Sequence, residues 1–177
     1  MTKTDKRRLK TRDKIETAMV TLCQSKVNFA TVTAPKIAAA AGISRQTFYR
    51  YYLIPKQVIT NLIDRHLNEF LKTFRLQNLT ARKMVLQLMT IWRDRTTVLE
   101  LVEWSDSRYE FIRALAQFNQ QIATQNQVNL INEQTVCNVY AAATYMLLRD
   151  YVLKNRWTQE QATDLLLHLT NNMDQIF

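Results

Sequence analysis

The stretch IAAAAGISRQTFYR, residues 37–50, decides the fold of this chain. It joins an alanine-rich run, which favours helix, to a turn at Gly42, the only glycine among 177 residues. Glycine adopts a left-handed backbone conformation without steric cost, and Ser44 is a good residue to cap the start of a new helix. The stretch therefore predicts two short helices joined by a tight turn, which is the layout of a DNA-binding helix-turn-helix.

Apolar residues at helical spacing extend this pattern along the chain. With one glycine and two prolines there is little room for turn-rich β structure, so we expect an all-α protein. Residues 1–10 are polar and basic and are expected to form a frayed arm. A first helix is expected over 11–26, with Asn28 as its left-handed stop. Further helices are expected over 34–41, 45–52, 55–75, 80–93, 97–115, 133–155 and 158–176, with a helix end and loop in the Gln- and Asn-rich residues 117–134.

These helices divide into two predicted domains. Residues 1–54 form a three-helix helix-turn-helix domain with a basic arm, and a long helix joins it to a helical domain over residues 55–177. Thr158 and Gln161 match the capping-box pattern at the start of the last helix. The last two helices, about 133–176, are both amphipathic and need a surface to pack on. That surface is either a second copy of the chain or the interior of the monomer.

Positive charge is concentrated in the first part of the chain. The formal net charge is +9, and residues 1–75 hold 15 of the 24 Lys and Arg residues but 5 of the 15 Asp and Glu residues. This part therefore carries +10 and the remainder −1. Such asymmetry favours a polyanionic partner for the N-terminal domain, although a solvated basic surface would give the same count.

Several other classes of protein lack support in the sequence. Cys23 and Cys137 lie within helical patterns and suggest no disulfide framework, as in a reducing compartment. No signal peptide or transmembrane segment is recognisable, so we expect a cytoplasmic protein. His66 and His168 have no partner at metal-ligand spacing, and no nucleophile motif or phosphate loop is present. We therefore expect no enzyme activity, no metal and no cofactor.

The predicted third helix has one face suited to DNA. Phe48 and Tyr52 are four residues apart and share the face that packs inward. Arginine pairs with guanine, glutamine pairs with adenine, and threonine contacts the thymine methyl group in the major groove. Tyrosine hydroxyls donate to phosphates. The outward arc carries these residue types at Arg45, Gln46, Thr47, Tyr49, Arg50 and Tyr51.

Residues 33–52 resemble the signature of the TetR family of transcription regulators. The matching pattern is T-x-x-x-I-A-x-x-A-G-I-S-x-x-T-F-Y-x-Y-Y, which runs from Thr33 to Tyr52. The helix over 11–26 is also similar to the first helix of that family. Two departures stand out: Val27-Asn28 replaces the usual glycine after the first helix, and Lys56 lies one position later than the family lysine.

The resemblance implies roles for individual residues. Thr33, Tyr49, Tyr51 and Lys56 are implied contacts to the DNA backbone. The base-reading positions are Arg45, Gln46 and Thr47, with Arg50 able to serve either purpose and Ser44 at the start of the reading helix. The arm residues Lys3, Lys6, Arg7 and Arg8 either reach the DNA or remain solvated.

By the same resemblance, residues beyond about 76 form a dimerisation and effector domain. Homodimers would form through residues 133–176, where Ala141-Ala142-Ala143 allows close helix approach. Aromatic residues here either line a cavity for a small apolar effector or belong to the ordinary core. The candidates are Trp92, Trp104, Tyr109, Phe118, Tyr140 and Tyr145, with Phe111 and Met146 beside them.

The resulting hypothesis is a homodimeric regulator, usually a repressor in this family, released from a pseudo-palindromic operator by an effector. One alternative is a regulator without a small-molecule ligand, controlled by a protein partner or acting as an activator. Another is a basic protein that binds nucleic acid or membranes without sequence preference, for which salt effects would dominate.

Overall fold

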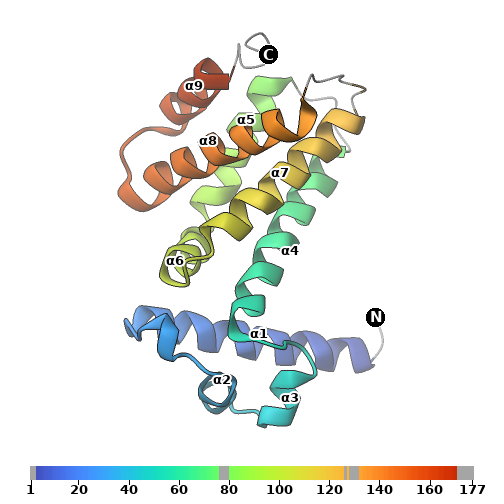
Figure 1. Cartoon of the computed structure of the whole chain (residues 1–177), viewed down its shortest axis with the longest axis vertical. Helices are drawn as coiled ribbons and strands as arrows, with labels where there is room; N and C mark the ends of the chain where they lie inside the picture. Colours follow the sequence, from blue (N-terminus) through green and yellow to red (C-terminus); the bar gives the residue numbers. More distant parts are fainter. Residues whose placement is uncertain (1–2, 76–79, 126, 128–131, 171–177) are drawn as a thin grey trace. The chain divides into compact units, whose positions relative to one another are not determined.

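The computed structural model describes residues 3–75, 80–125, 127 and 132–170 (Figure 1). All regular secondary structure in these ranges is helical, which confirms the predicted all-α class. No helix within them is both long and apolar enough to cross a lipid bilayer. Contacts divide the chain into two compact units. Unit 1 comprises Met1–Leu62 and Glu100–Ser107, and unit 2 comprises Ile63–Leu99 and Arg108–Phe177.

Unit 1 contains the helix-turn-helix. Its elements are α1 (Lys3–Gln24), the 3-10 helix η1 (Phe29–Thr31), α2 (Ala34–Ala40), α3 (Arg45–Tyr49), the start of α4 (Pro55–Arg75) and the end of α6 (Thr96–Trp104). Helix α2 packs against both α1 and α3, and Figure 1 shows the short turn that joins α2 to α3. The core consists of the apolar stripes expected from the sequence, including Ile15, Met19, Ile37, Phe48, Tyr52 and Ile59.

Unit 2 is built from the rest of α4 and α6 with α5 (Ala81–Arg93), α7 (Arg108–Gln125), α8 (Glu133–Lys154) and α9 (Gln159–Thr170). Helix α7 packs along α8, and α9 packs against α5 and α8. A buried aromatic row joins these helices: the ring centroids are 4.9 Å apart for Trp92 and Phe111, and 5.2 Å apart for Phe111 and Tyr145. The capping box is confirmed, because Thr158 N donates to Gln161 Oε1 and Gln161 N donates to Thr158 Oγ1.

Several expected boundaries differ in the structure. The frayed arm is wrong for residues 3–10, which are the first turns of α1; Lys and Arg are good helix formers, and the Thr11 hydroxyl donates to the Arg7 carbonyl. The single helix over 97–115 is interrupted at residues 105–107 and resumes as α7, which continues to Gln125. The third helix ends at Tyr49, so Tyr51 lies in the following turn. The predicted residues 171–176 of the last helix lie outside the described residues.

Three helix ends in unit 1 share one hydrogen-bond pattern. Gly42, Lys26 and Asp106 each have a positive φ, of 62°, 54° and 50°. In each case the residue's N–H bonds the carbonyl three positions earlier, and the next N–H reaches five positions back, as in a Schellman motif. The expected stop at Asn28 is therefore wrong: Lys26 is left-handed, and Asn28 caps η1 by accepting from Ala30 N.

Trp104, at the end of α6, contacts residues that follow α1. Its indole N–H donates to the Val27 carbonyl at 2.6 Å, and its ring meets Phe29 edge-on with centroids 5.0 Å apart. Glu100–Ser107 and the first part of α4, as far as Leu62, belong to the same unit as the N-terminal helices. The division of the chain is thus discontinuous, whereas the sequence suggested one boundary after residue 54.

We predict that Gly42→Ala destabilises unit 1 by about 1 kcal/mol. A Cβ at this position meets no atom within 4 Å, so the cost comes from the left-handed backbone and not from a clash. Urea unfolding followed by circular dichroism measures the change. Gly42→Asn is the matched control and should lose less, because Asn tolerates the left-handed region. An alanine variant as stable as the parent would contradict the assigned turn.

Candidate nucleic-acid interface

Two hydroxyl side chains fix the starts of the helices in the helix-turn-helix. Ser44 Oγ accepts from Thr47 N at 3.1 Å and lies 2.8 Å from Thr47 Oγ1. Thr33 Oγ1 accepts from Lys36 N at 3.4 Å, which caps α2 in the same way. Both caps satisfy backbone N–H groups that a helix start leaves without partners. Ser44 and Thr33 therefore position the helices while their own side chains stay exposed.

Helix α3 has an inner and an outer face. Phe48 is fully buried and packs against Tyr52, with ring centroids 5.8 Å apart. On the outer face, Arg45 and Gln46 are exposed, and Tyr49 is 42% exposed. The Arg45 guanidinium lies 5.6 Å from the centre of the Tyr49 ring, which holds this long side chain over the helix surface. Arg50 is exposed as well, whereas the other two residues of the predicted arc, Thr47 and Tyr51, are half-buried, and Tyr51 lies beyond the end of α3.

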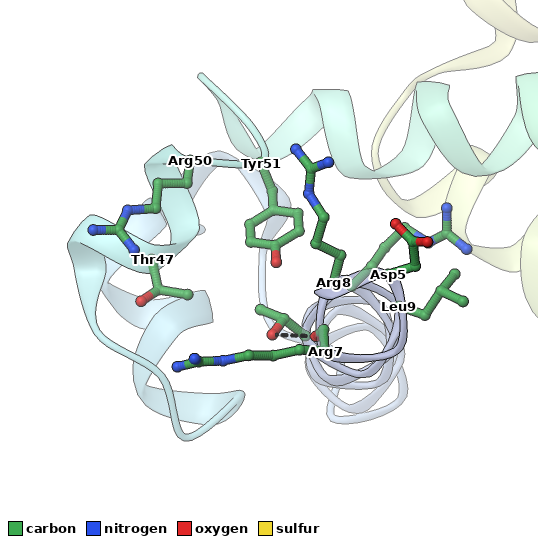
Figure 2. Close-up of a pocket in the computed structure, with 9 residues that line it drawn as sticks. Asp5, Arg7, Arg8, Leu9, Thr47, Arg50 and Tyr51 are labelled. Carbon is green, nitrogen blue, oxygen red and sulfur yellow. Dashed lines mark hydrogen bonds between the residues drawn. The ribbon is translucent and has the colours of Figure 1, made fainter. Parts of the chain in front are cut away.

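Beside α3 lies a groove, here called the arginine groove, between that helix and the N-terminal half of α1. Its volume is about 1000 Å³. Figure 2 shows Arg7 extending from α1 toward α3, and the Tyr51 ring pointing into the space between them. The groove is lined by Asp5, Arg7, Arg8, Leu9, Thr11, Arg12, Thr47, Arg50 and Tyr51.

The charge of the arginine groove is strongly positive. It holds four arginines against one aspartate, Asp5. Arg12 faces Glu16 at 3.7 Å, whereas Arg7, Arg8 and Arg50 have no carboxylate within salt-bridge distance among the described residues. Guanidinium groups bind phosphate oxygens in a bidentate geometry. The groove is therefore suited to a phosphate-bearing polymer, with the Tyr51 hydroxyl as a further donor.

The sequence analysis predicted Arg7 and Arg8 as contacts but missed Arg12, because it did not expect α1 to include residues 3–10. Residues four apart on a helix share a face, so Arg8 and Arg12 line one side of the groove only if α1 continues through residue 8. The expected frayed arm hid this spacing. Lys6 is exposed on the same helix but does not line the groove, and nothing is described of the Lys3 side chain.

Lys56 is used differently from the other predicted contacts. Its ammonium donates to the Asp106 carbonyl at 3.2 Å, at the C-terminal end of α6. A cation is favourable there because the last carbonyls of a helix carry partial negative charge. The structure therefore does not bring Lys56 into the arginine groove.

The candidate effector residues are dispersed in the structure. A cavity of about 320 Å³ in unit 2 is lined by Phe118 and Tyr140 among others. Trp92 and Tyr145 are fully buried in the aromatic row and do not line it. Tyr109 is 74% exposed, and Trp104 lies in unit 1. Of the six residues, the structure therefore brings two together at a cavity.

Neither thiol is prepared for nucleophilic chemistry. Burial, followed by the charge of Glu100, raises the pKa of Cys23, and burial with Glu133 raises the pKa of Cys137. Both thiols therefore stay protonated at neutral pH, whereas the thiolate is the reactive form. Across the described part of the chain, no group of three or more His, Cys, Asp or Glu side chains is arranged to hold a metal ion.

Solved structures share this fold at low sequence identity. Lin0861 from Listeria innocua matches with a TM-score of 0.85 at 21% identity, over 97% of this chain and 94% of that one. A protein from Syntrophomonas wolfei, named as a putative TetR-family transcriptional regulator, matches with a TM-score of 0.70 at 16% identity. This match covers 95% of this chain and 96% of that one. The transcriptional regulator FadR from Bacillus subtilis, solved with stearoyl-CoA, matches with a TM-score of 0.52 at 13% identity. This match covers 89% of this chain and 96% of that one. No family model and no curated protein matches the sequence.

We predict that replacing Arg7 and Arg8 together by glutamine weakens binding to every duplex DNA by the same factor. The slope of log K against log salt should become shallower by about two, because each lost phosphate contact removes about 0.9. Fluorescence anisotropy over a salt series measures this slope. The matched control is Lys72→Gln with Lys83→Gln, which removes the same charge from exposed positions in unit 2. An unchanged slope for the arginine variant would show that the groove holds no phosphates.

Proposed function

We propose that this chain, which has the fold of TetR-family transcription regulators, is a sequence-specific DNA-binding regulator and not an enzyme. The observation that carries the proposal is α3 itself. A Ser44-capped helix exposes Arg45 and Gln46 beside the positively charged arginine groove. Base-reading and backbone-binding groups on adjacent surfaces are what specific DNA recognition needs.

The proposed contacts follow from the chemistry of each side chain. Arg45 donates to guanine, Gln46 pairs with adenine, and Thr47 contacts a thymine methyl group. Tyr49 and Tyr51 bind phosphates, and Arg50 binds either a phosphate or a base. Thr33 keeps its hydroxyl proton for a phosphate while its oxygen caps α2. Lys56 is assigned to the end of α6, because reaching DNA would break its bond to Asp106.

Two copies of the chain are proposed to pair through α8 and α9. Val139 and Met146 are exposed on α8, 36% and 49%, and Ala142 lies between them on the same helix face. On α9, Leu169 is 52% exposed. Ala141 is fully buried within the monomer. Ala142 and Ala143 are therefore the small residues that would allow α8 to approach a helix of the second copy closely. Exposed apolar residues on two adjacent helices favour a self-complementary interface.

Regulation is proposed to act through an effector that binds in unit 2 and causes the protein to dissociate from its operator. FadR from Bacillus subtilis was solved with stearoyl-CoA, and unit 2 of this chain has a cavity of its own. Helices α4 and α6 each run from one unit into the other along the chain. A ligand that shifts either helix therefore changes the spacing of two reading helices, and repression ends when they no longer fit one operator.

Selection of bound sites from random duplex DNA at physiological salt tests the function. The proposal predicts an inverted repeat whose half-sites are separated by one helical turn or a multiple of it. Binding without any recovered motif, and lost at modest salt, would contradict sequence-specific regulation and indicate general polyanion binding.

We predict that Arg45→Ala relaxes preference at one base pair of each half-site, at a cost of about 1–3 kcal/mol for the preferred sequence. Competition binding with single-base operator variants measures this loss. Tyr49→Phe is the control: it removes a phosphate contact and should weaken all sequences alike. Equal losses on every sequence for Arg45→Ala would rule out its role as a base reader.

A further inference from the structure

The arginine groove of unit 1 is large enough for a whole small molecule. Its volume of about 1000 Å³ is at the upper end of the range for ligand pockets, which is roughly 300–1,000 Å³. Its lining residues come from α1, α3 and the turn that follows α3, and all of them belong to unit 1. One phosphate group of a DNA backbone fills only a small part of this space, so the groove has room for a ligand with additional groups.

The guanidinium groups of the groove are not neutralised by the protein. Arg7, Arg8 and Arg50 are exposed and form no salt bridge among the described residues. Glu16 Oε1 lies 3.7 Å from Arg12 Nε, beyond hydrogen-bond distance, and this buried Nε has no hydrogen-bond partner in the part of the chain that the structure describes. An anionic ligand can therefore bind these arginines without first breaking strong contacts within unit 1.

The net charge of the groove matches a short chain of phosphates. Four arginines and one aspartate, Asp5, leave an excess of three positive charges. A triphosphate carries about three to four negative charges at neutral pH. Each guanidinium group can bond two phosphate oxygens at once. A triphosphate thus compensates the groove more completely than a single phosphate or carboxylate group does.

An aromatic ring also lines the groove. Tyr51 is half-buried, and its ring lies beside that of Tyr52 with centroids 6.4 Å apart. Figure 2 shows the Tyr51 ring pointing into the space between α1 and α3, toward which Arg7 also extends. Nucleic-acid bases stack on tyrosine rings, and guanidinium groups add cation–π attraction. A ring and four guanidinium groups in one hollow are therefore complementary to a base joined to a chain of phosphates.

From these observations we infer that the arginine groove binds a free nucleoside triphosphate, with its phosphates on the arginines and its base on the Tyr51 ring. The same side chains are proposed above to bind the DNA backbone, so the nucleotide and the operator compete for one surface. The inference names a regulator of DNA binding, separate from the effector in unit 2, and in that respect rests on the proposed function. Nucleotide binding itself requires only unit 1, because every lining residue belongs to it.

The first test compares ATP with inorganic tripolyphosphate, which has the same chain of phosphates without base or sugar. Calorimetric titration of the full chain, at about 0.15 M salt without magnesium, should show saturable binding of both. ATP should bind about tenfold more tightly, because base stacking adds to the phosphate contacts. Equal affinities of the two compounds, or no binding of ATP to the folded parent, would overturn the inference.

Variants of Tyr51 test the stacking contact. Tyr51→Leu should weaken ATP binding about tenfold and leave tripolyphosphate binding unchanged, whereas Tyr51→Phe keeps the ring and should keep the affinity for ATP. Tyr109→Leu is the matched control, because Tyr109 is a 74% exposed tyrosine of unit 2 that does not line the groove. Equal affinities for ATP in the Tyr51→Leu and Tyr109→Leu variants would overturn the assigned stacking.

The double variant Arg7→Gln with Arg8→Gln tests the phosphate contacts. It should weaken ATP and tripolyphosphate by the same factor, at least about tenfold, because hydrogen bonds to charged groups are lost. Circular dichroism verifies the fold, and Lys72→Gln with Lys83→Gln is again the control of equal charge in unit 2. ATP binding that is unchanged in the arginine variant would overturn the assigned position of the nucleotide.

Competition with DNA tests the regulatory part of the inference. ATP should displace a fluorescent duplex from the parent chain, with an inhibition constant equal to the Kd from calorimetry, because two ligands of one surface exclude each other. ATP that binds without displacing the duplex would overturn the proposed competition.

Selection of DNA sites with the same preparations separates the two proposals. ATP binding without any selected motif would contradict the proposed function and support the nucleotide site. A selected motif without ATP binding would support DNA recognition and overturn the nucleotide site.

Discussion

The structure of the helix-turn-helix depends on one backbone turn, at Gly42. Its left-handed conformation ends α2, and Ser44 starts α3 two residues later, so the direction of α3 is fixed by a few dihedral angles and one side-chain cap. Phe48 then anchors the inner face of α3 in the core, which forces the opposite face outward. With one residue between turn and cap, the outer face has little freedom to rotate. A rigid short helix is a precise way to place side chains against base edges.

The helix-turn-helix was predictable because each local signal agreed with its packing. Glycine, serine cap and inward aromatics all pointed to the same arrangement. The ends of α1 and α6 were not predictable in this way, because Lys26 and Asp106 are left-handed without being glycine. Their turns are stabilised by Schellman hydrogen bonds, and Trp104 adds a long-range bond to Val27 that local sequence does not reveal. The arginine groove was missed in part for a related reason, since only a helical α1 aligns its arginines.

Charge and apolarity are separated between the two units. Unit 1 has the basic groove and an exposed reading arc, whereas the cavity of unit 2 has no charged residue in its described wall. The arginine groove and the cavity are therefore lined by residues of different units. In the proposed regulation the two sites are connected by α4 and α6, the helices whose residues belong to both units. Such coupling is a difference in free energy between two arrangements of these helices, not a shared contact.

Methylation interference on a bound duplex tests the central claim most directly, because it reports which groove each base contact uses. Guanine N7 lies in the major groove and adenine N3 in the minor groove. If α3 of each of two copies reads the DNA, methylated guanines should block binding in two clusters whose centres are about 10–10.5 base pairs apart, or a multiple of that distance. Interference confined to adenine N3, or a single cluster of guanines on a stably bound site, would contradict the account.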